Sequence, residues 1–186
     1  MKLVTGSETG IDTAVPYVDY FEGMMSLAPY RLPDAGRNMA DIVAPTPDIL
    51  KFQVGVGYRI PLWELVYHDC VVSYWYWGDY NNKMPEVWDR RDLFDMLYGV
   101  PPVFMLDQKL WDRDKDKFAA SYHRIGPLAR ELACDEMLTH AFITADHTVQ
   151  ETTWRSGTRV FVNFGSIAYK LANGDELAPL SCRVLR

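Results

Sequence analysis

The sequence has a small share of positive charge and few cysteines. Its 186 residues carry 19 Lys and Arg against 25 Asp and Glu, which gives a formal net charge of -6. Nucleic-acid binding requires a basic stripe or patch, so the charge balance argues against nucleic acid as a partner. Three cysteines cannot all pair within one chain, and they lack the spacing of metal ligands. We therefore predict reduced structural thiols at Cys70, Cys134 and Cys182.

Long apolar runs and several catalytic signatures are also missing. No stretch approaches the roughly 20 apolar residues that span a bilayer, and the N-terminal MKLVTGSETG is not a hydrophobic signal segment. As it stands the sequence indicates a cytoplasmic protein, whereas a piece of a longer chain could equally come from the periplasm or the cell exterior. The sequence has no GxSxG elbow, phosphate loop, dinucleotide fingerprint or HExxH motif. We predict no cofactor, no metal and no membrane partner.

Aromatic residues are abundant and concentrated in one place. They make up 13% of the chain, and residues 71–80, VVSYWYWGDY, hold five rings in ten positions. Flat rings with polar neighbours stack on the C–H faces of sugars and add hydrogen bonds. This predicts substrate contacts at Trp75, Trp77, Asp79 and Tyr80. Because alternate residues of a strand face opposite sides, we expect at least half of the rings to lie in the core.

The predicted elements change character near residue 135. Up to that point strands alternate with helices, which is typical of parallel β/α units. Beyond it the hydrophobic period is two, with turn signals at 156–157 and 173–175. The first part has predicted strands at 2–6, 60–67 and 100–106 and predicted helices at 13–28, 85–98 and 112–133, of which the last is interrupted at Gly126-Pro127. The second part has predicted strands within 137–146, 148–155, 158–165 and 177–186.

This order predicts an α/β plus all-β protein. Residues 1–134 are expected to form terminal β/α units of a TIM-type barrel, and residues 135–186 a small antiparallel β-sandwich domain. Two or three β/α units cannot close a barrel of eight strands. We therefore expect either self-association or further barrel units upstream in a longer chain.

Several motifs point to a family. They are ELVYHD at 64–69, VPPVFML at 100–106, TVQETTWRSGTRVFVNFG at 148–165 and NGDELAP at 173–179. Together they resemble the C-terminal part of bacterial glycoside hydrolases with a (β/α)8 catalytic barrel and an appended β-domain, the group of endo-α-N-acetylgalactosaminidase-like and α-galactosidase-like enzymes. The resemblance is stronger over 55–186 than over 1–54, and it implies hydrolysis of the O-glycosidic bonds of a carbohydrate.

Such chemistry requires two carboxylates, about 5 Å apart for retention or roughly 6.5–9.5 Å for inversion, at the carboxyl ends of barrel strands. Glu8, in the polar GSETG loop, is the first candidate, and its alternative is an exposed loop residue. Glu64 shares a predicted strand face with Leu62 and Val66 and should be buried, either as an acid of raised pKa or as a structural carboxylate. His68 and Asp69 follow that strand as candidates for sugar hydroxyls, and a structural histidine is the alternative.

Two other functions compete with hydrolysis. One is a carbohydrate-binding or assembly module without catalysis, in which the aromatic run is the binding surface. The other is a soluble α+β domain in which all the rings are core.

Overall fold

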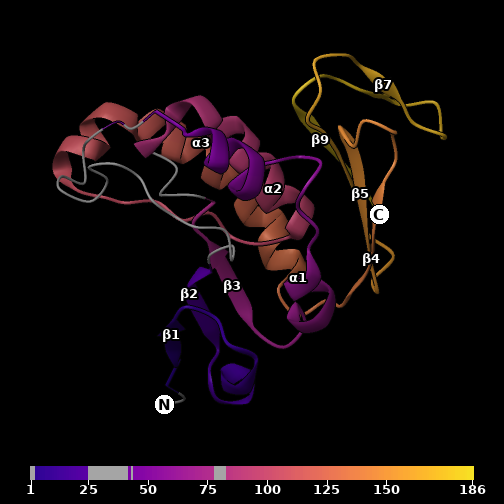
Figure 1. The fold of residues 1–186 in the computed structure, drawn as a ribbon. Helices are drawn as coiled ribbons and strands as arrows, with labels where there is room; N and C mark the ends of the chain where they lie inside the picture. Colours follow the sequence, from indigo (N-terminus) through magenta and orange to yellow (C-terminus); the bar gives the residue numbers. More distant parts are fainter. Residues whose placement is uncertain (1–2, 25–41, 43, 78–82) are drawn as a thin grey trace.

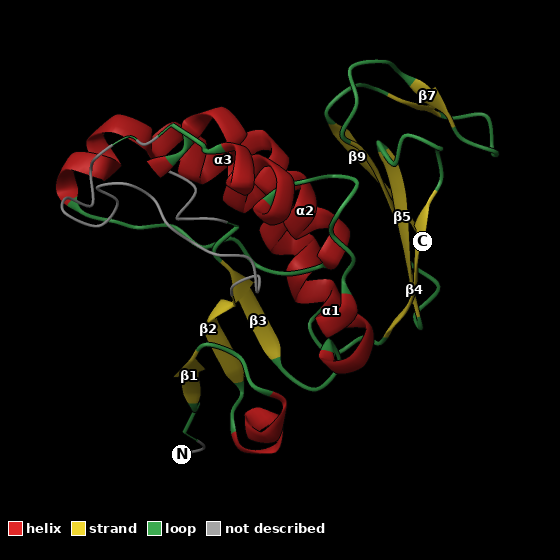
Figure 2. Ribbon diagram, in the orientation of Figure 1, coloured by secondary structure: helices red, strands yellow, loops and turns green. Residues whose placement is uncertain are grey.

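A computed structural model describes residues 3–24, 42, 44–77 and 83–186. A helical layer lies between a small parallel sheet and a larger antiparallel sheet (Figures 1 and 2). This mixed architecture confirms, in coarse terms, the predicted combination of α/β and antiparallel β structure. No helix in the described ranges has the length and apolar character needed to cross a bilayer.

The parallel sheet contains the strands β1 (Gly6–Glu8), β2 (Tyr20–Met24) and β3 (Val72–Trp75), in the order β1-β2-β3. A 3-10 helix, η1 (Asp12–Tyr17), connects β1 to β2. Because the strands are parallel, their carboxyl ends lie at one edge of the sheet. This is the edge at which β/α proteins place their functional groups.

Three α-helices make up most of the helical layer. They are α1 (Leu62–Tyr67), α2 (Trp88–Tyr98) and α3 (Gln108–Leu132), with the short helices η2 (Ile49–Gln53) and η4 (Pro85–Val87) beside them. As predicted, Pro85 opens the segment that leads into α2 and Gly99 closes it, with a left-handed φ of 66°. The Asp107 carboxylate caps α3 by accepting a hydrogen bond of 2.7 Å from the Leu110 amide.

The antiparallel sheet follows the predicted strand pattern. Its order is β4-β5-β6-β9, and a separate pair, β7-β8, extends from it. The turn glycines at the two predicted turns, Gly157 and Gly174, have φ values of 93° and 91°. The strands are β4 (Met137–Phe142), β5 (Val149–Trp154), β6 (Arg159–Asn163), β7 (Tyr169–Lys170), β8 (Glu176–Leu177) and β9 (Ser181–Leu185).

The prediction of a strand at 60–67 is wrong, because residues 62–67 form α1. Glu64 and His68 are one helical turn apart, so a helix buries both on one side, and both are indeed buried. The predicted strand at 100–106 is also wrong. Pro101 and Pro102 have no N–H to give to a sheet, so this segment runs beside β3 without pairing to it.

Three further boundaries differ from the predictions. Residues 3–5 of the predicted first strand are not in a strand, which begins at Gly6, and residue 2 lies outside the described residues. Over 13–24 the predicted helix at 13–28 is replaced by η1 followed by β2, and 25–28 lie outside the described residues. Pro16 limits η1 to a short 3-10 segment. The predicted interruption of α3 at Gly126-Pro127 does not occur, because the helix continues through Pro127.

Gly99 offers a test of how tightly the layers pack. A Cβ built on it would lie 2.8 Å from the Trp154 ring and 3.0 Å from the Leu132 side chain, and its φ is positive. Gly157 has a positive φ as well, but nothing lies within 4 Å of its Cβ position. Gly157→Ala should therefore cost roughly 1–2 kcal/mol from backbone strain alone. Gly99→Ala should cost about 1–3 kcal/mol more through overpacking. Urea unfolding of both variants measures the difference, and equal losses would contradict this packing.

Candidate functional site

The two faces of the parallel sheet are chemically different. Register places Phe21 opposite Ser73 and Met24 opposite Trp75. Helix α1 covers this side, because its Trp63 indole N–H donates to the Ser73 hydroxyl at 2.8 Å and its ring lies 5.7 Å from the Phe21 ring. We call it the helix face. Alternation along the strands places Glu8, Tyr20, Glu22 and Tyr74 on the opposite side, which we call the glutamate face.

Glu8 and Glu22 are register partners on β1 and β2. Adjacent strands lie about 4.8 Å apart, so the two side chains leave the sheet next to each other near its carboxyl edge. Glu8 is exposed and Glu22 is half-buried. The Tyr76 hydroxyl donates to Glu22 Oε1 at 2.7 Å and so fixes the direction of that carboxylate.

Gly23 makes this contact with Tyr76 possible. Its φ is 81°, and a Cβ at this position would lie 2.3 Å from the Tyr76 ring. A larger residue would therefore displace the ring that holds Glu22. Position 23 consequently requires glycine both for the backbone and for the close approach of the ring.

Tyrosine rings complete the glutamate face. Tyr20 and Tyr74 meet edge to face with centroids 6.2 Å apart. With Glu22 and residues 102–105 they line a hollow of about 460 Å³. Two carboxylates beside rings that carry hydroxyl groups can bind a sugar by stacking and hydrogen bonding, and can transfer protons to or from it.

Glu64 lies on the helix face, where its side chain is 2% exposed. Its Oε1 accepts a hydrogen bond of 2.5 Å from the Trp75 indole N–H. Burial raises the pKa of Glu64 from 4.5 to about 7, although its own backbone amide, the Trp75 hydrogen bond and the charge of Arg59 act in the opposite direction. The Arg59 guanidinium itself lies over the Trp75 and Trp77 rings, at 4.7 and 4.5 Å from their centroids.

His68 is enclosed at the end of α1. Both ring nitrogens face backbone carbonyls, Nδ1 at 3.0 Å from Asp135 and Nε2 at 3.2 Å from Gly99. Burial lowers its pKa. In the neutral ring one nitrogen donates to its carbonyl, so His68 connects α1 to the start of the antiparallel part. Asp69 is exposed, and its carboxylate accepts a hydrogen bond from the Cys70 thiol, which raises the pKa of that thiol.

The aromatic run is divided between the two faces. Trp75 and Trp77 are buried and stack on each other at 5.2 Å, and Trp77 also donates to Asp95 at 2.7 Å. Asp79 and Tyr80 lie outside the described residues.

The structure brings Glu8 together with Glu22, Tyr20 and Tyr74, and none of these three neighbours was predicted. The alternation in SYWYW contained a signal for them, since Tyr74 and Tyr76 must oppose the tryptophans.

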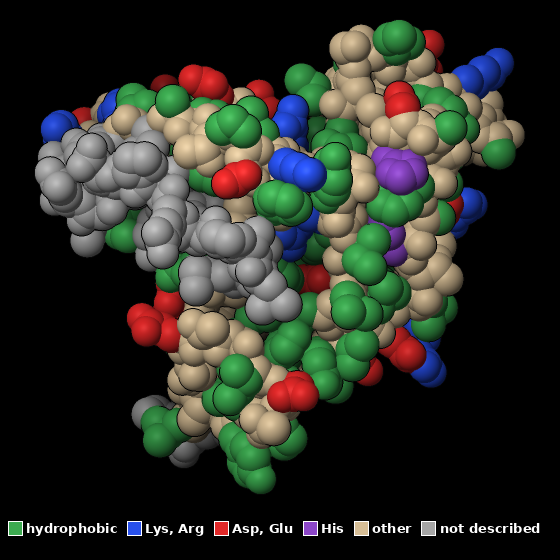
Figure 3. All heavy atoms as spheres, in the orientation of Figure 1, with side chains coloured by type: hydrophobic (Ala, Val, Ile, Leu, Met, Phe, Trp, Pro, Cys, Tyr) green, Lys and Arg blue, Asp and Glu red, His purple; other side chains and the backbone are tan. Residues whose placement is uncertain are grey.

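Lys and Arg side chains are scattered over the face shown in Figure 3 and form no large basic patch there. The described residues contain no group of three or more His, Cys, Asp and Glu placed to hold a metal ion.

Comparison with family models matches residues 29–153 to glycosyl hydrolases related to the GH101 family, GH129. The chain belongs to this family. The resemblance to glycoside hydrolases seen in the sequence is thereby confirmed. A search of curated proteins found no match.

Solved structures of alpha-N-acetylgalactosaminidase NagBb from Bifidobacterium bifidum are similar to this GH129 chain. Its GalNAc complex is 25% identical and matches 99% of this chain and 24% of that chain, with a TM-score of 0.60. The ligand-free form is 26% identical and matches 87% of this chain and 22% of that chain, with a TM-score of 0.52. The chain thus spans about a quarter of the length of these structures.

The buried carboxyl of Glu64 should make stability depend on pH. Its pKa is raised in the folded state, so the folded protein retains a proton between pH 4.5 and about 7 that the unfolded chain has released. This proton adds to the free energy of unfolding below pH 4.5, and the contribution is lost as pH rises to about 7. Relative to Glu64→Gln, the wild type should lose about 3 kcal/mol of unfolding free energy over this window.

Urea unfolding at pH 4.5 and pH 8 measures this difference. Glu8→Gln removes the same charge from an exposed side chain and serves as the control. If the two substitutions changed the pH dependence equally, the effect could not come from burial of Glu64.

Proposed function

We propose that this chain supplies part of the active site of a glycoside hydrolase that cleaves α-linked N-acetylgalactosamine. The observation that carries the proposal is the pairing of Glu8 with Glu22 at the carboxyl ends of adjacent parallel strands. Membership of the GH129 family and the similarity to NagBb, which is described as an alpha-N-acetylgalactosaminidase, support the reaction and the sugar.

In this proposal residues 1–134 are β/α units of a (β/α)8 barrel, and residues 135–186 form its appended β-domain. The parallel order β1-β2-β3 and the antiparallel order β4-β5-β6-β9 support this division. The glutamate face would then be the inner face of the barrel, and helix α1 would belong to the outer layer. The three parallel strands among the described residues cannot close a barrel, so further strands would come from a longer polypeptide or from other copies of the chain.

Glu8 would act as the general acid that protonates the glycosidic oxygen, because its exposed carboxyl can reach the substrate. Glu22, oriented by Tyr76, would be the second carboxylate. The separation of these two carboxyl groups with substrate bound would decide between retention, which requires about 5 Å, and inversion, which requires roughly 6.5–9.5 Å. Tyr20 and Tyr74 would stack on the sugar, while Glu64, Trp75 and Trp77 would support the sheet from behind.

The test is hydrolysis of a chromogenic α-N-acetylgalactosaminide, with the solution mass of the chain measured in parallel by light scattering. Glu8→Gln and Glu22→Gln should each lower the rate by at least about 100-fold, since general acid–base catalysis contributes at least that factor. Glu86→Gln is the matched control, because Glu86 is exposed in η4 and lies on neither face of the sheet. Glu8→Gln and Glu22→Gln should still bind GalNAc, and this binding can be followed by NMR.

Three results would be decisive. Cleavage that requires Glu8 and Glu22 but not Glu86 would support the proposal. Binding of GalNAc without cleavage by any defined oligomer would favour the binding-module function instead. A chain that neither binds nor cleaves the sugar would show that the glutamate face is not a sugar site in this polypeptide.

A further inference from the structure

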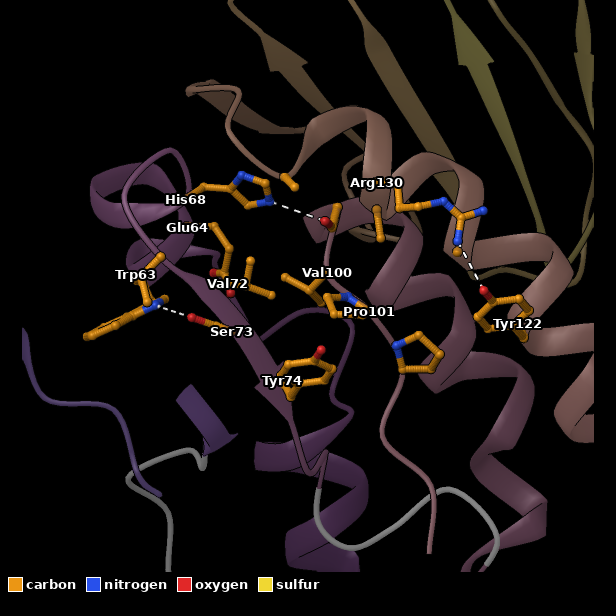
Figure 4. A pocket seen from close by; sticks show the side chains of 16 residues that line it. Trp63, Glu64, His68, Val72, Ser73, Tyr74, Val100, Pro101, Tyr122 and Arg130 are labelled. Atoms are coloured by element: carbon orange, nitrogen blue, oxygen red, sulfur yellow. Dashed lines mark hydrogen bonds between the residues drawn. The ribbon is translucent and has the colours of Figure 1, made fainter. Parts of the chain in front are cut away.

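A cavity of about 220 Å³ lies at the edge of β3 that does not pair with β2. Figure 4 shows the side chains that line it. Residues 71–74 of the β3 region form one wall, residues 99–102 form a second, and one side of α3 forms a third. Glu64 and His68 reach it from α1.

Two features of the sequence keep side chains and backbone from filling this cavity. Pro101 and Pro102 cannot donate backbone hydrogen bonds, so the segment after α2 cannot pair with β3 and close the gap. Gly126 and Ala129 of α3 and its C-cap Ala133 face the cavity, follow one another at helical spacing and project little volume. The lining is therefore mostly apolar, with few polar groups.

One polar atom at this cavity is unusual. The Glu64 side chain is 2% exposed, and its Oε1 already accepts the Trp75 indole N–H. Its Oε2 is buried and has no hydrogen-bond partner among the described residues. Buried polar atoms are nearly always paired, so an unpaired carboxyl oxygen on a residue that lines an apolar cavity indicates a missing partner.

We propose that this cavity binds a small uncharged molecule consisting of an apolar ring with one hydroxyl group, and that the hydroxyl pairs with Glu64 Oε2. A hydroxyl can both donate and accept, so it complements this oxygen whether or not the carboxyl carries a proton. A cavity of about 150 Å³ is large enough for benzene, so a ring with a small substituent fits this one.

Charged ligands fit the cavity less well. The Glu64 carboxyl opposes an anion, and Arg130, which lines the cavity and donates to the Tyr122 hydroxyl at 3.1 Å, opposes a cation. The proposal is independent of hydrolysis at the glutamate face, because it involves neither Glu8 nor Glu22.

The experiment compares phenol with benzene, which differ only in the hydroxyl group. Each is titrated into the 15N-labelled 186-residue chain, and the amide signals of Gly99 and Gly126 and the indole signal of Trp63 are followed. Phenol should shift all three and bind about tenfold more tightly than benzene, the factor expected from one buried hydrogen bond. Absence of shifts at these signals, or equal affinity for the two ligands, would overturn the proposal.

Two substitutions on α3 give a matched comparison. Ala129→Leu fills the cavity and should abolish binding of both ligands, whereas Ala120→Leu makes the same change at an exposed position outside the cavity and should leave binding intact. Glu64→Leu should retain benzene and lose the preference for phenol. If Glu64→Leu fails to fold, the comparison of Ala129→Leu with Ala120→Leu still tests the proposal. Equal binding by these two variants would place the ligand outside the cavity.

Discussion

The packing of helix α1 against the parallel sheet depends on a buried hydrogen bond that the Trp75 indole N–H donates to the Glu64 carboxyl. Helix α1 has only six residues, too few to be stable through its own backbone bonds. It is held instead by its side chains: Trp63 donates to Ser73 on β3, Glu64 accepts from Trp75, and His68 faces the carbonyls of Gly99 and Asp135. These contacts decide which face of the parallel sheet is covered.

The same contacts join the three layers of the molecule. The His68 ring meets the Trp154 ring at 4.5 Å, so the end of α1 is in direct contact with the antiparallel sheet. Trp154 in turn closes over Gly99 at the end of α2. Both ring nitrogens of His68, which the sequence suggested for sugar binding, thus face backbone carbonyls, and this position favours a structural role.

Burial of Glu64 and the ends of α2 could be predicted from sequence, because burial follows from apolar neighbours and helix ends follow from Pro85 and Gly99. The helical state of 62–67 could not, because apolar residues at 62, 63, 65, 66 and 67 fit strand and helix periods alike over so short a stretch. Strand β2 was missed for a similar reason. Its five residues include Gly23, which reads as a breaker, although the strand needs it for contact with Tyr76.

Because β2 was not predicted, Glu22 was not recognised as a candidate, and Glu8 and Glu64 were the two glutamates that the sequence singled out. Two carboxylates can act on one glycosidic bond only if they reach it from the same cavity. Glu8 leaves the sheet on one face, whereas Glu64 lies behind the other and is bound to Trp75. The backbone of the sheet separates them. Glu22, in contrast, lies beside Glu8 on the same face, because parallel register makes the two residues partners.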